Sequence, residues 1–131
     1  MRRRTRRGLV TATLVGLVAA LLPLAGVAAA GPVYINEIQV STTSTDWEFF
    51  ELQGAAGTDL SGYTLVGVES DVGSSSGRID RAISLSGETI PADGFWVAMS
   101  PAAVTAYGTS GDASISNNTF ENSTATYFLV T

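Results

Sequence analysis

The chain has 131 residues, enough for a single domain of ordinary size, and its seven basic residues face 12 acidic ones for a net charge of −5. It contains no Cys, His or Lys, which excludes a disulfide framework, an ordinary zinc site, a Ser-His-Asp triad, a P-loop and a lysine Schiff base. Five of the seven arginines lie in the first seven positions, so the rest of the chain sets two arginines against 12 acidic residues, a net charge of −10. Because such a charge repels phosphates, we expect no direct binding to nucleic acid.

The first 30 residues have the three parts of a secretory signal peptide. The arginine-rich start is followed by an apolar stretch over residues 9–24, and then by small residues at Ala28 and Ala30 ahead of Gly31. That apolar stretch is shorter than the roughly 20 residues that a membrane-spanning helix needs. We therefore expect residues 1–30 to be a cleaved signal peptide and residues 31–131 to be a secreted domain without membrane contact. We expect the general secretory route rather than the twin-arginine route, because any arginine-rich start produces an Arg-Arg pair.

Beyond residue 31 the chain consists of short runs rich in Val, Ile, Tyr, Phe and Trp, separated by Gly, Pro, Asp and Ser. Such runs predict strands, and their number indicates an all-β sandwich or barrel. The predicted strands cover residues 33–40, 47–53, 63–69, 79–85, 95–100 and 126–131. In the fourth of them, alternation predicts that Ile79, Arg81, Ile83 and Leu85 face the same way.

One short helix is predicted after the fifth strand, with Ser100 as its N-cap, Pro101 at its first position and Gly108 as its stop. The polar stretch from 107 to 126 is predicted to be a long surface loop. The apolar run of the last predicted strand, residues 127–130, has one residue after it. It either closes a sheet or belongs to a sandwich truncated at its C-terminus. We favour truncation, which would leave an edge open to self-association by strand addition.

Two acidic patterns are candidates for chemistry. Glu48 and Glu51 suggest the carboxylate pair of a glycosidase, but residues three apart on a strand point to opposite faces. We therefore expect one of them to face solvent and the other to accept hydrogen bonds from the backbone or a loop. Glu69, Asp71 and Asp80 border a Gly/Ser-rich loop and are candidate calcium ligands, with a solvated acidic loop as the alternative. No other cofactor is expected.

The aromatic residues near the second and fifth strands allow two interpretations. They are Trp47, Phe49, Phe50, Phe95 and Trp96. They could form a platform that stacks on sugars, but alternation sends about half of them inward, so we expect most of them to be sandwich core.

The turn before the third strand is expected to place two leucines in the core. We predict that Leu60 and Leu65 pack inward beside Phe50 and Leu52. Glycine lacks a Cβ and is tolerant of tight turns, so we expect Gly62 to permit this one.

Three segments, in order, resemble the bacterial lamin-tail domain. Residues 33–38 (VYINEI) are similar to its INEI opening strand, residues 48–52 (EFFEL) to its E-F-I-E-L second strand, and residues 58–65 (TDLSGYTL) to its D-L-S-G-W-x-L turn and third strand. Residues 83–99 resemble the stretch that leads to a later strand of that domain. The residues that carry the resemblance are Asn36, Glu37, Glu48, Glu51, Asp59, Leu60, Gly62 and Tyr63, the last standing where Trp is usual.

The resemblance implies an immunoglobulin-like β-sandwich without an active site of its own, of the kind found as a module in secreted and surface proteins of bacteria. We therefore predict a non-catalytic extracellular module for binding or structural tethering, with an extracellular protein or a polysaccharide as its partner. The alternative is the N-terminal accessory domain of a secreted nuclease or phosphoesterase whose catalytic domain lies beyond residue 131. The reading frame downstream of codon 131 distinguishes the two. A small enzyme within the chain is disfavoured, because acid–base catalysis would depend on carboxylates alone.

Overall fold

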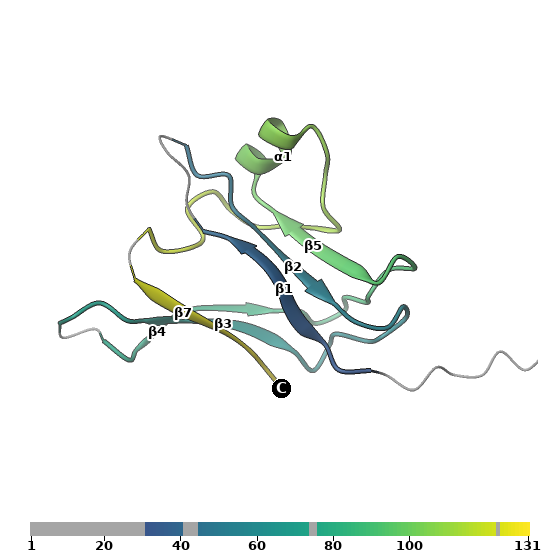
Figure 1. Cartoon of the computed structure of the whole chain (residues 1–131), viewed down its shortest axis with the longest axis horizontal. Coiled ribbons are helices and arrows are strands. Elements are labelled where there is room, and N and C mark those ends of the chain that lie inside the picture. Colours follow the sequence, from purple (N-terminus) through teal and green to yellow (C-terminus); the bar gives the residue numbers. More distant parts are fainter. Residues whose placement is uncertain (1–30, 41–44, 74–75, 123) are drawn as a thin grey trace, which may run out of the picture.

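The structure, a computed structural model, describes residues 31–40, 45–73, 76–122 and 124–131. These residues form seven strands in two sheets and one short helix (Figure 1). The predicted fold class, an all-β sandwich, is therefore confirmed. The predicted signal peptide and its cleavage site at Ala28 and Ala30 lie outside the described residues, and Gly31 is the first residue described.

The larger sheet has four strands in the order β1–β2–β5–β6. They are β1 (Tyr34–Gln39), β2 (Phe49–Gln53), β5 (Phe95–Met99) and β6 (Ala113–Ser114). β2 pairs antiparallel with both β1 and β5, whereas the two residues of β6 run parallel to β5. β6 lies in the stretch that the sequence predicts as loop, because two residues give no alternating pattern.

The smaller sheet has three strands in the order β4–β3–β7. They are β4 (Ile79–Ser84), β3 (Thr64–Glu69) and β7 (Ala125–Val130). β7 pairs antiparallel with β3 through six consecutive residue pairs, and no described strand pairs with its other side. The last strand therefore forms an edge of this sheet.

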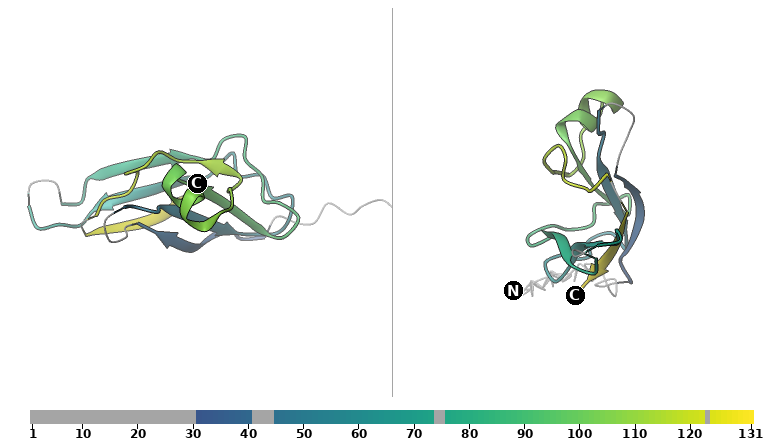
Figure 2. Two further views of the ribbon diagram at one scale, coloured as in Figure 1. Left: turned by 90° about the horizontal axis from the view of Figure 1, so that it is seen from above. Right: turned by 90° about the vertical axis from the view of Figure 1, so that its left-hand side faces the viewer.

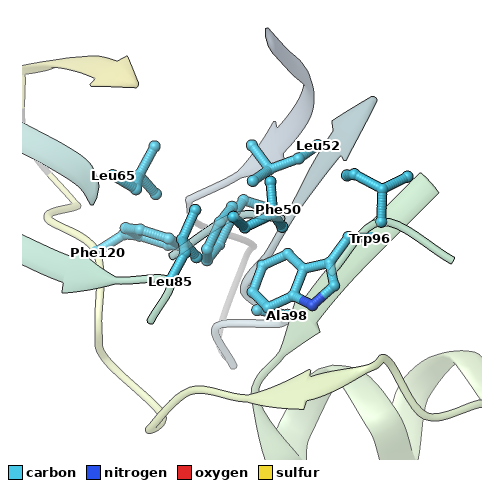
Figure 3. Packing of buried hydrophobic residues seen from close by; sticks show 9 residues of the cluster. Phe50, Leu52, Leu65, Leu85, Trp96, Ala98 and Phe120 are labelled. Atoms are coloured by element: carbon cyan, nitrogen blue, oxygen red, sulfur yellow. The ribbon is translucent and has the colours of Figure 1, made fainter. Parts of the chain in front are cut away.

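The inner faces of the two sheets enclose one hydrophobic core, which Figure 3 shows from close by. Phe50 and Leu52 of β2 are fully buried there, and Leu60 and Leu65 join them from the turn and strand of the other sheet. The prediction that these four residues pack together is confirmed. The other buried members of the core are Leu85, Ile90, Trp96, Ala98 and Phe120.

Irregularities in register turn individual residues away from the face that strict alternation predicts. The pairing of β3 with β4 shifts between Gly67 and Val68, so that Gly67 is opposite Arg81 and Val68 is opposite Ile79. The extra residue, Asp80, reverses the alternation beyond it. The prediction that Ile79 faces the same way as Ile83 is wrong for this reason, and the Ile79 side chain is 66% exposed.

The helix α1 (Pro101–Tyr107) follows β5 directly and ends where the sequence predicts. The Ser100 hydroxyl accepts a hydrogen bond from the Ala103 N–H (3.2 Å), and Pro101 occupies the first turn. Gly108 adopts a left-handed conformation with φ of 69°, which a residue with a Cβ rarely adopts, and its N–H bonds to the Val104 carbonyl. In Figures 1 and 2, α1 lies at the opposite end of the molecule from the three-stranded sheet.

Tyr127 of β7 links the pH dependence of folding to the core. Its ring packs edge-on against Phe120 at 5.3 Å, and burial raises the pKa of its hydroxyl above the usual value of about 10. A raised pKa in the folded state means that this contribution to stability is present below pH 10 and is lost as the pH rises through the folded-state pKa. We expect Tyr127→Phe to lose less thermal stability than the parent protein between pH 9 and strongly alkaline pH, as measured by circular dichroism. Parallel losses in the two proteins would contradict this.

A groove on the outer face of the four-stranded sheet

An open groove of about 800 Å³ lies on the face of the four-stranded sheet that points away from the core. Successive residues of a strand point to opposite faces, so the residues between the core positions of β2 and β5 form its floor. These floor residues are Phe49, Glu51, Phe95, Val97 and Met99. Glu37 of β1 lies on one side, Asp93 belongs to the turn before β5, and Tyr107, Thr109, Ser110, Gly111 and Asp112 complete the lining. We call this surface the outer groove.

The segment between α1 and β6 is fixed against β5 and forms one wall of the outer groove. The Asp112 N–H donates to the Val97 carbonyl, and the Val97 N–H donates to Asp112 Oδ2, each at 2.8 Å. Gly111 lies so close to β5 that a Cβ on it would come within 2.5 Å of the Val97 carbonyl oxygen and 3.0 Å of Met99 Cγ. Only glycine therefore permits this approach of two backbone segments.

Gly111→Ala tests how tightly this wall is fixed. Because the contact with the Val97 carbonyl involves backbone, the wall must move, and we expect the free energy of unfolding to fall by about 1–3 kcal/mol in urea titrations. Gly62→Ala is the matched control, since a Cβ there meets open space and the backbone φ of Gly62 is not positive. We expect that variant to stay within about 0.5 kcal/mol of the parent. Equal effects of the two substitutions would contradict the close packing at Gly111.

The aromatic residues divide between the two faces of the sheet as alternation predicts. Phe50 and Trp96 are buried in the core, and their rings lie 5.5 Å apart. Phe49 and Phe95 line the outer groove. Trp47 is 40% exposed outside the core, so two of the five residues are core and the prediction that most of them are core is wrong.

Tyr107 belongs to the outer groove although nothing in its sequence context predicts this. It is the last residue of α1, and its ring meets those of Phe49 and Trp47 edge-on at 5.8 and 6.1 Å. The sequence predicts the helix and its stop correctly. It does not predict that the helix turns its last residue back over β2, since that depends on the packing of α1.

Four carboxylates surround the outer groove, from four separate segments of the chain: Glu37, Glu51, Asp93 and Asp112. Glu37 and Glu51 are directly paired across β1 and β2, because a register irregularity between Ile35 and Glu37 leaves Asn36 as an extra residue. The Asn36 side-chain amide donates to Glu51 Oε1 at 2.6 Å. No Arg side chain lines this surface.

Glu48 and Glu51 lie on opposite faces, as their spacing predicts. Glu48 is fully buried, and its carboxylate accepts hydrogen bonds from the Thr119 N–H (2.9 Å) and the Phe120 N–H (2.8 Å). Its own carbonyl accepts from the Ser100 N–H. Glu48 thus ties the loop before β7 to the start of β2, and the two carboxylates cannot flank one bond of a substrate.

The three calcium candidates do not form a site. Glu69 Oε1 accepts from the Asp71 N–H, Asp71 Oδ1 accepts from the Thr124 N–H, and Asp80 pairs with Arg81 at 3.5 Å. Among the residues that the structure describes, no three Asp, Glu, His or Cys side chains are grouped so that they could hold a metal ion. In the structure these carboxylates are used in local hydrogen bonds and in an ion pair between neighbouring residues.

The other residues that carry the family resemblance lie in the turn before β3, where they contribute to the turn and to the core. Asp59 Oδ1 accepts from the Ser61 N–H at 2.8 Å, and hydrogen bonds from the hydroxyl and the N–H of Ser61 lower the pKa of Asp59. Leu60 is buried in the core, and the partly buried Tyr63 side chain packs against the core cluster. Gly62 lies in this turn, but the turn does not depend on a glycine there, because its φ is outside the left-handed region and a Cβ would meet open space.

The described part of the chain has no helix that is long and apolar enough to cross a membrane. Comparison of the chain with models of protein families, with curated proteins and with solved structures finds no match in any of the three.

Proposed function

We propose that this chain is a non-catalytic binding module of an exported bacterial protein and that the outer groove is its ligand-binding surface. The observation that carries the proposal is the groove itself, an open surface where aromatic rings and carboxylates gather on a sheet whose other face forms the core. Phe49, Phe95 and Tyr107 meet there beside polar groups, and a concave surface that combines apolar rings with a few polar groups is typical of binding sites.

Two further observations support a binding rather than a catalytic role. The sequence lacks His, Cys and Lys, so acid–base catalysis would depend on carboxylates alone. The carboxylate pair suggested by the sequence is split between core and surface, with Glu48 buried and Glu51 on the outer groove. The outer groove has the aromatic rings and polar groups that recognise a ligand, but no pair of carboxylates placed for catalysis was found at Glu48 and Glu51.

We also propose that the sandwich is immunoglobulin-like and of the lamin-tail type. This assignment is supported by the positions of the residues that carry the resemblance: Asn36 bonds to Glu51 and joins the first two motif strands, while Asp59 and Leu60 shape the turn into β3. Export is supported by the arginine-rich start and the apolar stretch that follows it.

A binding panel with a blocked groove tests the proposal. The purified protein is titrated by calorimetry with four ligands: a Lys-Gly decapeptide, a Glu-Gly decapeptide, a Gly-Ser decapeptide and a soluble neutral glucan. Val97→Arg places a long side chain on the groove floor, and Ala82→Arg adds the same charge to an exposed position of β4. We expect saturable binding of at least one ligand that Val97→Arg abolishes and Ala82→Arg preserves. Binding of none of the four, or equal binding by both variants, would contradict the proposal.

A further inference from the structure

We propose that the ligand of the outer groove is an extended peptide segment that carries several Lys or Arg side chains. This inference rests on the proposed function and adds the chemical class of the partner.

The charge of the outer groove is of one sign. Its four carboxylates have no cation among the lining residues, and the only arginines in the described part of the chain, Arg78 and Arg81, belong to the β4 region of the other sheet. Arg81 is already paired with Asp80. A groove whose walls all bear negative charge repels anionic ligands and concentrates cationic ones.

Two of these carboxylates are held together at a cost. Glu37 and Glu51 face each other across neighbouring strands, an arrangement in which like charges destabilise a sheet. The Asn36 amide donates to one oxygen of Glu51, whereas the Glu37 carboxylate makes no side-chain hydrogen bond or ion pair within the described residues. A cationic group placed between them would remove the repulsion, so binding of a cation is favoured at this point.

The surface between the carboxylates suits the side chains of Lys and Arg. Phe49, Phe95 and Tyr107 offer rings against which an alkyl stem packs and over which a cation is attracted. Tyr107 is 48% exposed and therefore accessible to a ligand. A neutral sugar could also stack on these rings, but it would leave the charge of the groove uncompensated.

The carboxylates are distributed rather than convergent. They come from β1, β2, the turn before β5 and the segment before β6, and no three of them are grouped closely enough to hold a metal ion. One small cation cannot meet all of them. A peptide segment with several cationic side chains can reach carboxylates in different parts of the groove. The spread of negative charge over a groove of about 800 Å³ therefore favours a basic peptide.

The test compares two double variants that remove the same charge from different faces. The ligand is the Lys-Gly decapeptide, and its Kd is measured by calorimetry for the parent protein, for Glu37→Gln/Glu51→Gln in the groove and for Glu69→Gln/Asp80→Asn on the other sheet. We expect the groove variant to bind about tenfold more weakly and the control to stay within about twofold, since exposed charge pairs contribute modestly and locally. Tyr107→Leu, which keeps an apolar side chain but removes the ring, should weaken binding severalfold.

Melting curves of the two double variants show whether either has lost its fold. The groove variant should be at least as stable as the parent because a like-charge pair is removed. Equal weakening in both double variants would overturn the inference, since it would show attraction to net charge alone. Preferred binding of the glucan, lost in Val97→Arg, would overturn the inference and leave the proposed function standing. If none of the four ligands binds to the outer groove of the parent protein, both the inference and the proposed function are overturned.

Discussion

Glu48→Leu is expected to lower the free energy of unfolding by about 2–5 kcal/mol, because it leaves two buried donors without an acceptor. The Glu48 carboxylate accepts the N–H groups of Thr119 and Phe120, and all three residues are buried. No water reaches these N–H groups when the carboxylate is removed, so their desolvation is no longer compensated. Urea unfolding monitored by Trp fluorescence measures the change.

Glu51→Leu is the matched control for that experiment. It makes the same substitution three residues further along β2, where the side chain lies on the outer groove. We expect a change within about 0.5–1 kcal/mol, typical of surface positions. If Glu48→Leu is as mild as Glu51→Leu, the buried carboxylate does not hold the loop before β7 in place.

Leu60→Ala is expected to destabilise the protein by about 2–5 kcal/mol, as is typical when a fully buried leucine is shortened. Leu60 has no exposed surface and packs in the same cluster as Phe50, Leu52 and Leu65, so its removal leaves a cavity where the two sheets meet. Its backbone is held on both sides, since its N–H bonds to Glu88 and its carbonyl accepts from Tyr63. The surroundings are therefore poorly able to close the cavity.

Thermal unfolding followed by circular dichroism checks this expectation. Val72→Ala is the control, because Val72 is fully exposed in the loop after β3 and its shortening should not change the melting temperature. An unchanged melting temperature for Leu60→Ala would show that the turn before β3 does not contribute to the core.

The strands and the helix were largely predictable because each depends on local sequence. Short runs of β-branched and aromatic residues located six of the seven strands, and Ser100, Pro101 and Gly108 located the helix and its ends. The errors arise where tertiary contacts decide. The bulge opposite Gly67 turns Ile79 outward. The two residues of β6 pair with β5 between backbone hydrogen bonds of Asp112 to Val97 and of Ile115 to Met99, which a local pattern does not predict.

The outer groove was predictable in part. Alternation along β2 and β5 sends Phe49, Glu51 and Phe95 to one face, and that much follows from the sequence. Asp93 and Asp112 lie in connecting segments, where the sequence has no periodicity to indicate direction. Their approach to the sheet depends on hydrogen bonds of those segments, such as that from the Phe95 N–H to Asp93.

The edges of the two sheets differ in how they are protected against pairing with another chain. β1 has a register irregularity and Glu37, and β4 has a register irregularity and the charged pair Asp80 and Arg81. β7 is paired with β3 without interruption, has no charged residue, and exposes Phe128 and Val130. Self-association by strand addition stays a prediction, and β7 is the strand at which we expect it.

The place where the basic peptide binds shows whether the outer groove is the ligand-binding surface. Backbone amide shifts of the purified protein are followed by NMR while the Lys-Gly decapeptide is added. We expect saturable shifts concentrated in β2, in β5 and in the segment from Tyr107 to Asp112, which together contribute most of the outer groove. Shifts centred on β3, β4 and β7, or spread over all acidic surfaces, would contradict this expectation.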